Sequence, residues 1–532
     1  MIVATKLGGY FDLPNPSLLA QLGRNETGQP EIYTTPFFKG QSTGDILAKW
    51  DRYLKAADIP MKYPGMYKFE EDLRAKVGPM SVIRPFSARQ ADVESYYTSV
   101  EKPSKPLSDN ALSAVLDLFG NSNHLRLKSQ EQVWEDLDSK SRSAGAPTMV
   151  SKKKAIDKTL PAVFSAPDLL QTPNWHGHTA CIMFSRGQEG GPEPEDTKNR
   201  VIWGAPLGEI LVEGQFYQPK IALKQSLPEF PHLRGSEAVD ERCTKLLTTK
   251  NPRDLVVCTD FDRYDQHFNE NMQNFARQVD AHLLGGVDHP WLENVFPAKF
   301  SIPIVCTKSV TFKGKHGMAS GSYGTNDDET DSHAGLQFEA AQAAHEDLNE
   351  YSQRNGDDGA LSYPGITVKQ VVTCYTQHGM EMNVSKQWAS NNDMVYLRNW
   401  HSLDYKIDGV CRGVYSTFRA LGRLRYQERY YDPEKWGPEM VTLRAWSILE
   451  NCKWHPLFEP LVDYVIEKGD KYQLGLKLDG FMENVSHVAM EAMDNFSDFL
   501  GFNKTLAQSA EQTAKGIKDW RIYQYLMSKK KR

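Results

Sequence analysis

The sequence predicts an α+β protein with more than one lobe. At 532 residues the chain is too long for one simple core. Long helical patterns such as 325–349 alternate with short apolar runs of strand character, of which 255–258 is the clearest. Hydrophobic residues make up 40% and charged residues 24% of the chain, which is typical of globular proteins, and no apolar run reaches the length of a membrane span.

Composition also limits the chemistry and the partners. The seven cysteines are scattered without a C-x-x-C pair, so we expect no zinc site and no disulfide framework, and a reducing compartment. The N-terminus lacks the pattern of a signal peptide. A protein that coats nucleic acid should be basic, but this chain has a net charge of −6. If it handles nucleic acid, its cations must gather in an interior channel.

In the N-terminal half the pattern is mostly irregular. Residues 1–60, rich in Pro and Gly, predict an extended arm with one helix near 46–54, and 108–140 is predicted helical. A loop is expected over 187–196, followed by a strand at 200–203.

The central part is more regular. The run at 255–258 predicts a buried strand that delivers Asp260 at its end, followed by a helix over 268–284. A glycine-rich loop over 314–324 leads into the helix predicted at 325–349. Further helices are expected from about residue 405 onward, with one candidate over 414–430.

The acidic turn at 355–359 is the main chemical signal. Asp357 and Asp358, joined by Asp260 from another strand, would suit two divalent metals about 4 Å apart. Seen alone, a Gly-Asp-Asp sequence is an ordinary hairpin turn, and Asp262 or Asp265 is an ordinary helix cap. The partner acid at the end of a strand is what favours a metal site.

The glycine-rich loop supplies a second signal. Backbone N–H groups and hydroxyls at the start of a helix suit a phosphate or a sugar, although an ordinary loop with a Ser or Thr cap has the same composition.

These elements, in this order, resemble palm motifs A, B and C of the viral RNA-dependent RNA polymerases. The matching residues are Asp260-x4-Asp265, Ser320-Gly321-x3-Thr325 and Gly356-Asp357-Asp358. Flanking segments resemble motifs G, F, D and E at 143–147, 198–203, 379–386 and 396–398 respectively. Segments 265–268 and 200–203 are most similar to the picobirnavirus and partitivirus group of double-stranded RNA viruses.

The resemblance implies a closed right-hand polymerase of fingers, palm and thumb, with a small antiparallel palm sheet packed on helices. The implied parts are an N-terminal arm over 1–70 that bridges fingers and thumb, fingers over 71–254 and 268–305, palm over 255–267 and 306–398, and thumb with a C-terminal extension over 399–532. The resemblance also implies that the stretch from about 465 folds back toward the cavity, as such extensions can in relatives, and regulates initiation.

The resemblance also implies roles for single residues. Asp260, Asp357 and Asp358 would bind Mg²⁺, which Mn²⁺ can replace, and Lys386 would protonate the leaving group. The implied nucleotide and ribose contacts are Lys198, Arg200, Arg186, Asp265, Ser320, Gly321, Thr325 and Asn326. The implied template contacts are Ser143, Gly145, Pro147 and Arg398.

Some positions depart from the family pattern. Many relatives have an Asn four residues after the motif B Thr, where this chain has Glu329, so the reader of the ribose 2′-OH stays open among Asn326, Ser320 and Thr325. The strand before the acidic turn, 352–355, is unusually polar. The arginines at 412, 419, 423 and 429 either track product phosphates from one helical stripe or form a solvated face.

The expected function is therefore replication and transcription of a viral RNA genome from NTPs. The implied partners are RNA template and product, NTPs and a viral capsid protein, with no membrane, and the enzyme is expected to be a monomer in the virion interior and host cytoplasm. The alternatives are a reverse transcriptase-like palm polymerase, a structural RNA-packaging protein with an inactive palm, or a two-metal nuclease. The acidic pI and the presence of all three acids argue against RNA packaging, and a nuclease does not explain the lysines and arginine of motifs F and D.

Overall fold

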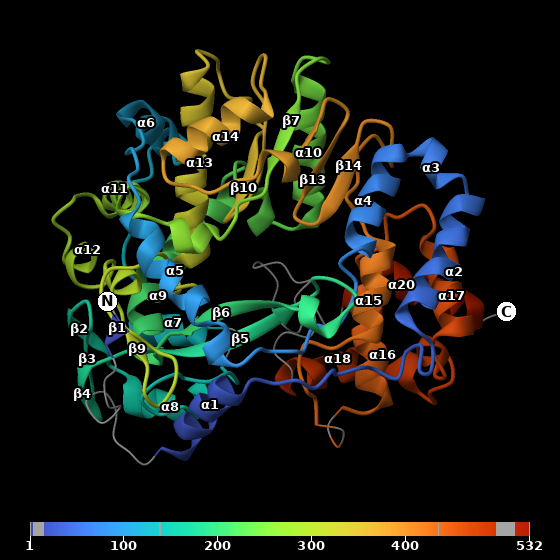
Figure 1. The fold of residues 1–532 in the computed structure, drawn as a ribbon, viewed down its shortest axis with the longest axis horizontal. Coiled ribbons are helices and arrows are strands. Elements are labelled where there is room, and N and C mark those ends of the chain that lie inside the picture. The colour runs from blue at the N-terminus through green and yellow to red at the C-terminus, as the bar shows by residue number, and fades with distance from the viewer. Residues whose placement is uncertain are drawn as a thin grey trace.

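The computed structural model describes residues 2–3, 15–137, 140–432, 434, 436–495 and 516–530, and its helices and strands form an α+β fold (Figure 1). The helices are α1 (Pro16–Thr27), α2 (Thr43–Ala56), α3 (Ile59–Lys62), α4 (Pro64–Arg74), α5 (Gln90–Thr98), α6 (Asp109–Asp117), α7 (Gln130–Glu135), α8 (Lys152–Thr159), α9 (Leu207–Ser226), α10 (Ser236–Thr249), α11 (Glu270–Leu284), α12 (Pro290–Asn294), α13 (Thr325–Ala343), α14 (Val368–Gln377), α15 (Thr417–Arg425), α16 (Pro438–Glu450), α17 (Phe458–Lys468), α18 (Phe481–Asn495) and α20 (Arg521–Lys530). The strands are β1 (Ile2–Val3), β2 (Val163–Ala166), β3 (Leu169–Thr172), β4 (Trp175–His178), β5 (Cys181–Gln188), β6 (Lys198–Gly204), β7 (Val256–Thr259), β8 (Ile304–Val305), β9 (Thr311–Phe312), β10 (Gln353–Asn355), β11 (Asp358–Leu361), β12 (Trp388–Ser390), β13 (Asp393–Tyr396), β14 (Asn399–Ser402) and β15 (Val414–Tyr415).

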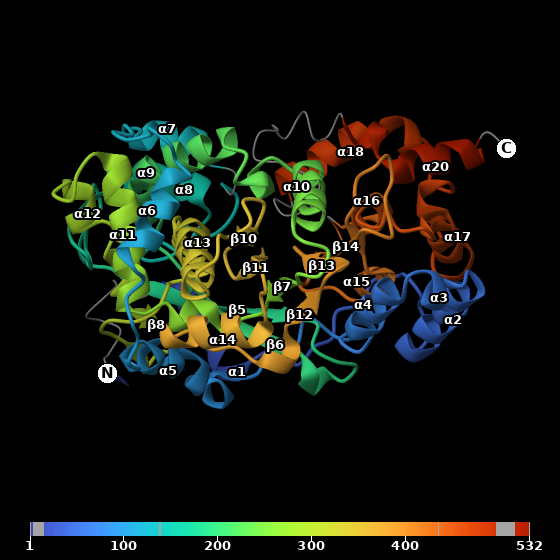
Figure 2. The same ribbon diagram turned by 90° about the horizontal axis from the view of Figure 1, so that it is seen from above.

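Within the described residues the strands form four small sheets. Their strand orders are β1-β9-β8-β5-β6, β10-β11-β7-β12, β13-β14-β15 and β2-β3-β4. The second of these is antiparallel throughout and lies near the centre of the molecule in Figure 2. It is the small antiparallel sheet that the sequence resemblance implies.

The central sheet is buried on both faces, which explains its apolar strand β7. Val257 and Leu361 contribute to a hydrophobic cluster with α11, α13 and α14. Val256, Cys258 and Ala360 point to a second cluster with α10. A strand covered on both sides must be apolar at every position rather than at alternate ones. This continuous apolar run is why the sequence predicts a strand that ends just before Asp260.

The N-terminal segment is more helical than the composition predicts. Besides the expected helix, which is α2, the segment forms α1, capped by Asn15, whose side chain accepts from the N–H of Leu18. Asn25 on α1 donates to the backbone carbonyls of Met183 on β5 and Cys306 after β8, at 2.9 and 2.8 Å. Farther along, α2 and α4 pack into the same hydrophobic cluster as α15, α16 and α17.

Three predicted helices are shorter in the structure. Residues 118–129, between α6 and α7, are not helical, and Gly120 there has a positive φ of 58°. The helix α13 ends before His345, which also adopts a left-handed conformation. The helix α15 begins only at its cap Ser416, and after its end the chain pairs with the N-terminal segment, where Gln427 donates to the carbonyl of Tyr33.

The hairpin of β5 and β6 extends toward α15 (Figure 1). Contacts between the hairpin and α15 join these two parts of the chain into a ring. Glu189, just after β5, contacts Arg419 on α15 at 2.5 Å and Arg423 one turn later at 3.7 Å. Arg419 is 6% exposed, so it does not belong to a solvated face. The expected stripe of four arginines is also wrong, because Arg412 precedes β15 and Arg429 follows α15.

The C-terminal helices α17, α18 and α20 join the cluster that holds α15 and α16. Residues 496–515 of the expected C-terminal extension lie outside the described residues, as do 531–532 of the basic tail. In the described ranges none of the helices combines the length and the apolar character that crossing a bilayer requires. All seven cysteines are buried and unpaired.

Candidate active site

The three acids singled out in the sequence meet at one end of the central sheet. Antiparallel pairing of β7 with β11 sets Thr259 opposite Gly359. Asp260 therefore follows β7 at the same end at which Asp358 begins β11, with Asp357 in the preceding turn. Asp260 and Asp357 are exposed, and Asp358 is half-buried. Residues distant in sequence thus present carboxylates to one region of solvent.

The acids repel one another. Burial and then the charge of Asp357 raise the pKa of Asp358 to about 7, and Asp260 adds to this effect. Partial desolvation by the surrounding residues raises the pKa of Asp260, as does Asp357, whereas Lys76, Lys386 and Lys198 lower it. Carboxylates gathered against their own repulsion are the oxygen donors that hard divalent cations require.

The backbone of Asp260 is fixed by a side chain that the sequence analysis missed. The Gln387 side-chain oxygen Oε1 accepts from the N–H of Asp260 at 2.7 Å, and its Nε2 donates to the carbonyl of Asp260 at 2.9 Å. Gln387 follows Lys386, which ends a short 3₁₀ helix, η8 (Val384–Lys386), so the same segment delivers the lysine to the acids.

Cations from a different sheet face the acids. Lys198 and Arg200 lie on β6 and are exposed. The pKa of Lys198 is lowered by burial and by the neighbouring cations Lys76 and Arg200, against the opposite effect of Asp260. Lys76, in the loop after α4, was not predicted, because nothing in the local sequence distinguishes it from a surface lysine.

Arg186 is arranged differently from the other predicted triphosphate contacts. It pairs with Arg200 in the register of β5 and β6. Its Nε and Nη2 donate to the two carboxylate oxygens of Glu428, which follows α15, at 2.5 and 3.2 Å. The guanidinium thus joins the hairpin to the segment after α15.

The glycine-rich loop packs tightly on β6. A Cβ at Gly321 would lie 1.6 Å from the carbonyl oxygen of Trp203, so only glycine permits this approach. Ser320 Oγ is 3.5 Å from the carbonyl of Val201. The Thr325 hydroxyl donates to the carbonyl of Ala319 at 3.0 Å, which closes the loop onto the start of α13.

Asp265 lies in the short 3₁₀ helix η6 (Tyr264–His267), beside the acids. Its Oδ2 accepts a hydrogen bond from the Tyr96 hydroxyl, and its Oδ1 accepts from the N–H of Gln266 at 2.9 Å. Burial raises the pKa of Asp265, against the effects of these two donors and of Arg200. The carboxylate is therefore held in one orientation.

The motif B departure has a structural counterpart. Glu329 is 8% exposed, and burial together with Asp265 and Asp357 raises its pKa well above the usual value. Asn326, three residues earlier, donates through its Nδ2 to the Oδ1 of Asn355 at 2.8 Å.

The predicted template contacts lie at the end of β6 and at the edge of the central region. Gly145 has a φ of 67°, and its N–H donates to Ser143 Oγ at 3.2 Å. The carbonyl of Pro147 accepts from Asn15 at 2.7 Å. Arg398 lies in the turn between β13 and β14, and it contributes to the charges around Asp358.

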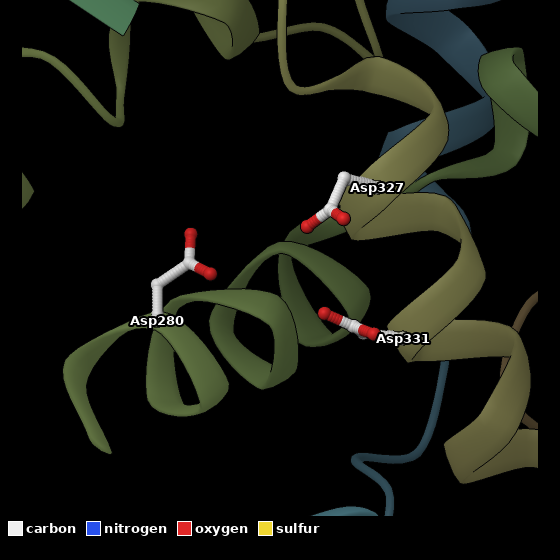
Figure 3. Close-up of side chains that lie close together, drawn as sticks. All are labelled: Asp280, Asp327 and Asp331. Atoms are coloured by element: carbon white, nitrogen blue, oxygen red, sulfur yellow. The ribbon is translucent and has the colours of Figure 1, made fainter. Parts of the chain in front are cut away.

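A second group of acids lies away from this site. Figure 3 shows Asp280 on α11 pointing toward Asp327 and Asp331 on α13, with ligand atoms within 4.8 Å of one another. The Nζ of Lys220 lies 2.5 Å from Asp280, 2.5 Å from Asp327 and 2.8 Å from Asp331. Burial disfavours the charged form of Asp327, but Lys220 and Lys224 outweigh this effect and lower its pKa to about 2. An ammonium group thus already takes the place of a metal.

Comparisons with known proteins agree on one family. The family described as "Viral RNA-dependent RNA polymerase" matches residues 130–453. Over 530 residues the chain is 45% identical to a "Potential RNA-dependent RNA polymerase" of Human picobirnavirus (strain Human/Thailand/Hy005102/-), with 98% of each chain covered. The crystal structure of the RNA-dependent RNA polymerase of a human picobirnavirus superposes with a TM-score of 0.92 at 44% identity, covering 99% of this chain and 100% of that one. An insertion loop deletion mutant of such a polymerase gives a TM-score of 0.90 at the same identity and coverage.

Proposed function

This chain belongs to the viral RNA-dependent RNA polymerases, and on that premise we propose which of its residues carry out nucleotidyl transfer from NTPs. The observation that carries the proposal is the convergence of Asp260, Asp357 and Asp358 at one end of the central sheet. Family membership supplies the reaction, and this geometry supplies the assignment.

The three acids are our assignment for the divalent metal ions that such polymerases use. The donor set fits, because the charge of Asp357 raises the pKa of both Asp260 and Asp358, and bound cations would relieve this repulsion. Oxygen ligands from carboxylates and phosphates favour Mg²⁺, and Mn²⁺ accepts the same ligands. When bound, such ions would activate the attacking 3′-hydroxyl and stabilise the leaving pyrophosphate.

Lys198, Arg200 and Lys76 are proposed to neutralise the triphosphate. All three are exposed, and the charges of Lys198 and Lys76 interact with that of Asp260. Charge-assisted hydrogen bonds from such side chains are the strongest phosphate contacts available to a protein. Arg186 remains in the proposed set, but it must exchange Glu428 for phosphate to take part.

Lys386 is proposed as the general acid that protonates the leaving pyrophosphate. It ends η8 immediately before Gln387, whose side-chain amide is hydrogen-bonded to the backbone of Asp260. Two hydrogen bonds from Gln387 to the backbone of Asp260 therefore tie the segment that carries this lysine to the acidic region. A general acid must be held within hydrogen-bond reach of the atom that it protonates.

Asp265 is proposed to accept a hydrogen bond from the ribose 2′-hydroxyl, the group that distinguishes RNA precursors from DNA precursors. Tyr96 orients the carboxylate for this purpose. Ser320, Gly321, Thr325 and Asn326 are proposed to shape the same subsite. Because Asn326 is engaged with Asn355, Asp265 rather than Asn326 is our candidate for direct contact.

Ser143, Gly145, Pro147 and Arg398 are proposed to guide template and product. The protein need only hold backbone and shape, since base pairing with the template selects the sequence. The positions of the first three beside the end of β6 support an entrance near the triphosphate cations.

The division of the chain into lobes is also a proposal. We assign the fingers to 71–254 and 268–305, the palm to 255–267 and 306–398, and the thumb with the extension to 399–532. The arm, 1–70, is proposed to bridge fingers and thumb, because Asn25 on α1 donates to the carbonyl of Met183 on β5 and α2 shares one cluster with the thumb helices. We also propose that the enzyme is a monomer that works in the virion interior and host cytoplasm, beside the capsid protein. Sedimentation with and without capsid protein tests the monomeric state and the capsid contact.

A polymerisation assay tests the residue assignment. Asp357→Ala should abolish Mg²⁺-dependent incorporation of NTPs on an RNA template while leaving the fold intact. The matched control is Asp262→Asn, which removes a neighbouring acid with a side chain 58% exposed. Normal synthesis by Asp357→Ala would remove the assignment, whereas loss in both variants would indicate a general sensitivity of this region to charge.

A further inference from the structure

One face of α13 carries a stripe of polar side chains that contact β10 and its turn. Asn326, Thr330, His333 and Gln337 recur at the spacing that places side chains on one face of a helix. Figure 2 shows α13 beside β10, the edge strand of the central sheet. At the far end of the stripe, Gln337 Nε2 donates to the carbonyl of Gln353 at 2.7 Å. Asn355 accepts from Asn326 and Arg354 donates to Gln337, so polar side chains of the strand before the acidic turn pair with the stripe.

Both backbone polar groups of Gly356 are held by this stripe. The N–H of Gly356 donates to Thr330 Oγ1 at 2.9 Å, while the Thr330 hydroxyl itself donates to the carbonyl of Asn326 at 2.6 Å. The carbonyl of Gly356 accepts from His333 Nδ1 at 2.8 Å. Gly356 has a φ of 59°, and a Cβ there would lie 2.8 Å from Asn326 Oδ1, so the turn fits closely against α13.

His333 also reaches the strand that carries the first catalytic acid. Because a carbonyl only accepts, Nδ1 of His333 carries the proton and Nε2 is left as an acceptor. Thr259 Oγ1 lies 3.4 Å from that Nε2. Burial lowers the pKa of His333 to about 4, so the ring is neutral. One imidazole therefore joins the residue before Asp357 to the residue before Asp260.

The ring has little freedom to move. Phe261 and Tyr375 contact it edge-on, with ring centroids 5.0 and 5.9 Å away. A Cβ at Gly359 would lie 2.4 Å from the ring, so the glycine of β11 makes room for it.

A different face of α13 is anchored in the protein interior. Lys220 and Lys224 on α9 contact Asp327 and Asp331, and Lys299 contacts Asp328 at 2.7 Å. These ammonium groups are fully or almost fully buried. The helix that holds the acidic turn is therefore itself fixed to α9.

We propose that Thr330 and His333 are positioning residues that hold the peptide of Gly356, and through it the carboxylate of Asp357, at a fixed place relative to Asp260. This inference rests on the proposed metal ligands. A turn with a glycine at positive φ has other peptide orientations available once its hydrogen bonds are removed. Loss of the two contacts should therefore loosen the shared site for the cations without changing the cations' ligands or the contacts to the triphosphate.

Isosteric substitutions separate positioning from packing. Thr330→Val keeps the shape but cannot accept from Gly356, whereas Thr330→Ser keeps the hydroxyl. His333→Phe keeps a ring without a donor, whereas His333→Asn restores a donor close to Nδ1. Gln337→Met is the structural control, because it removes a contact of the same stripe far from the turn.

The readouts are kcat, KM for NTP and the Mg²⁺ concentration that gives half of the maximal rate. Thr330→Val and His333→Phe should lower kcat by about 10- to 100-fold and raise the Mg²⁺ requirement, with KM for NTP nearly unchanged. Thr330→Ser and His333→Asn should recover most of both quantities. Gln337→Met should lower the melting temperature but leave the Mg²⁺ requirement at its wild-type value.

Two results would overturn the proposal. One is a wild-type Mg²⁺ requirement and kcat in folded Thr330→Val and His333→Phe. The other is an equal loss in Gln337→Met, which would reduce the effect to packing. Asp357→Ala distinguishes failure of the metal assignment from failure of the positioning role. If Asp357→Ala is active, the metal assignment fails. If it is inactive while Thr330→Val behaves as wild type, only the positioning role fails.

Discussion

Thr259 on β7 pairs with Gly359 on β11, and this one register brings the two acidic segments of the chain together. The next residue after Thr259 is Asp260, and the residue before Gly359 is Asp358. A shift of one residue would turn the side chains of one strand to the opposite face of the sheet. The position of the proposed metal site therefore depends on the same apolar residues that fix the strand between its two hydrophobic clusters.

Asp265→Asn should reduce discrimination between ribonucleotides and deoxyribonucleotides. The amide keeps the size of the side chain but weakens acceptance from the 2′-hydroxyl, so the ratio of kcat/KM for an NTP to that for the matching dNTP should fall about 10-fold or more. Tyr96→Phe, which only removes the group that orients Asp265, should shift this ratio less and in the same direction. An unchanged ratio in both variants would contradict the role of Asp265.

Two ion pairs close the ring between the β5–β6 hairpin and the region of α15, and they should differ in strength. Glu189 and Arg419 have side chains 12% and 7% exposed, so Glu189→Gln should destabilise the protein by about 2 kcal/mol. Arg186 is 49% exposed in its pair with Glu428, and Arg186→Gln should cost under about 1 kcal/mol. Denaturant unfolding of both variants measures the difference, and equal costs would contradict it.

Lys220→Met should be among the most damaging single substitutions outside the active site. It leaves Asp280, Asp327 and Asp331 buried without their shared ammonium group, at a cost on the order of 3–5 kcal/mol. Lys68→Met is the matched control, since Lys68 forms an exposed pair on a helix surface. A melting temperature for Lys220→Met close to that of the control would show that the cluster does not stabilise the fold.

The contribution of His401 to stability should fall on mild acidification. Burial lowers the pKa of His401 from 6.5 to about 4, so between these values the unfolded chain binds a proton that the folded chain does not. The contribution is fully present above pH 6.5 and is lost as the pH falls toward 4, with about 2 kcal/mol lost by pH 5 for this histidine. Unfolding at pH 7.5 and pH 5 measures the loss, which should be smaller in His401→Asn; a loss of equal size in that variant would exclude His401 as its source.

The sequence predicts well what depends on local pattern. The apolar run of β7 shows that a strand ends at Asp260, and the glycine-rich loop before Thr325 shows where α13 begins. The order of the acidic and glycine-rich elements was sufficient to identify the family, and the comparisons confirm it. Family membership also decides against the reverse transcriptase alternative.

What the sequence does not show depends on contacts between distant segments. Lys76 and Gln387 look like surface residues until the fold places them beside Asp260. The helix boundaries missed at α13 and α15 are set by a left-handed residue and by pairing with the N-terminal segment. Thr330 and His333 follow the period of a helix face, but a polar stripe has a visible purpose only beside the polar strand that it contacts.

The most direct test of the central claim is the position of bound Mn²⁺ in crystals of this polymerase with template, primer and NTP. We expect anomalous scattering between the carboxylates of Asp260 and Asp357, within coordination distance of oxygens of both. Density at the cluster of Asp280, Asp327 and Asp331, with none between Asp260 and Asp357, would contradict it.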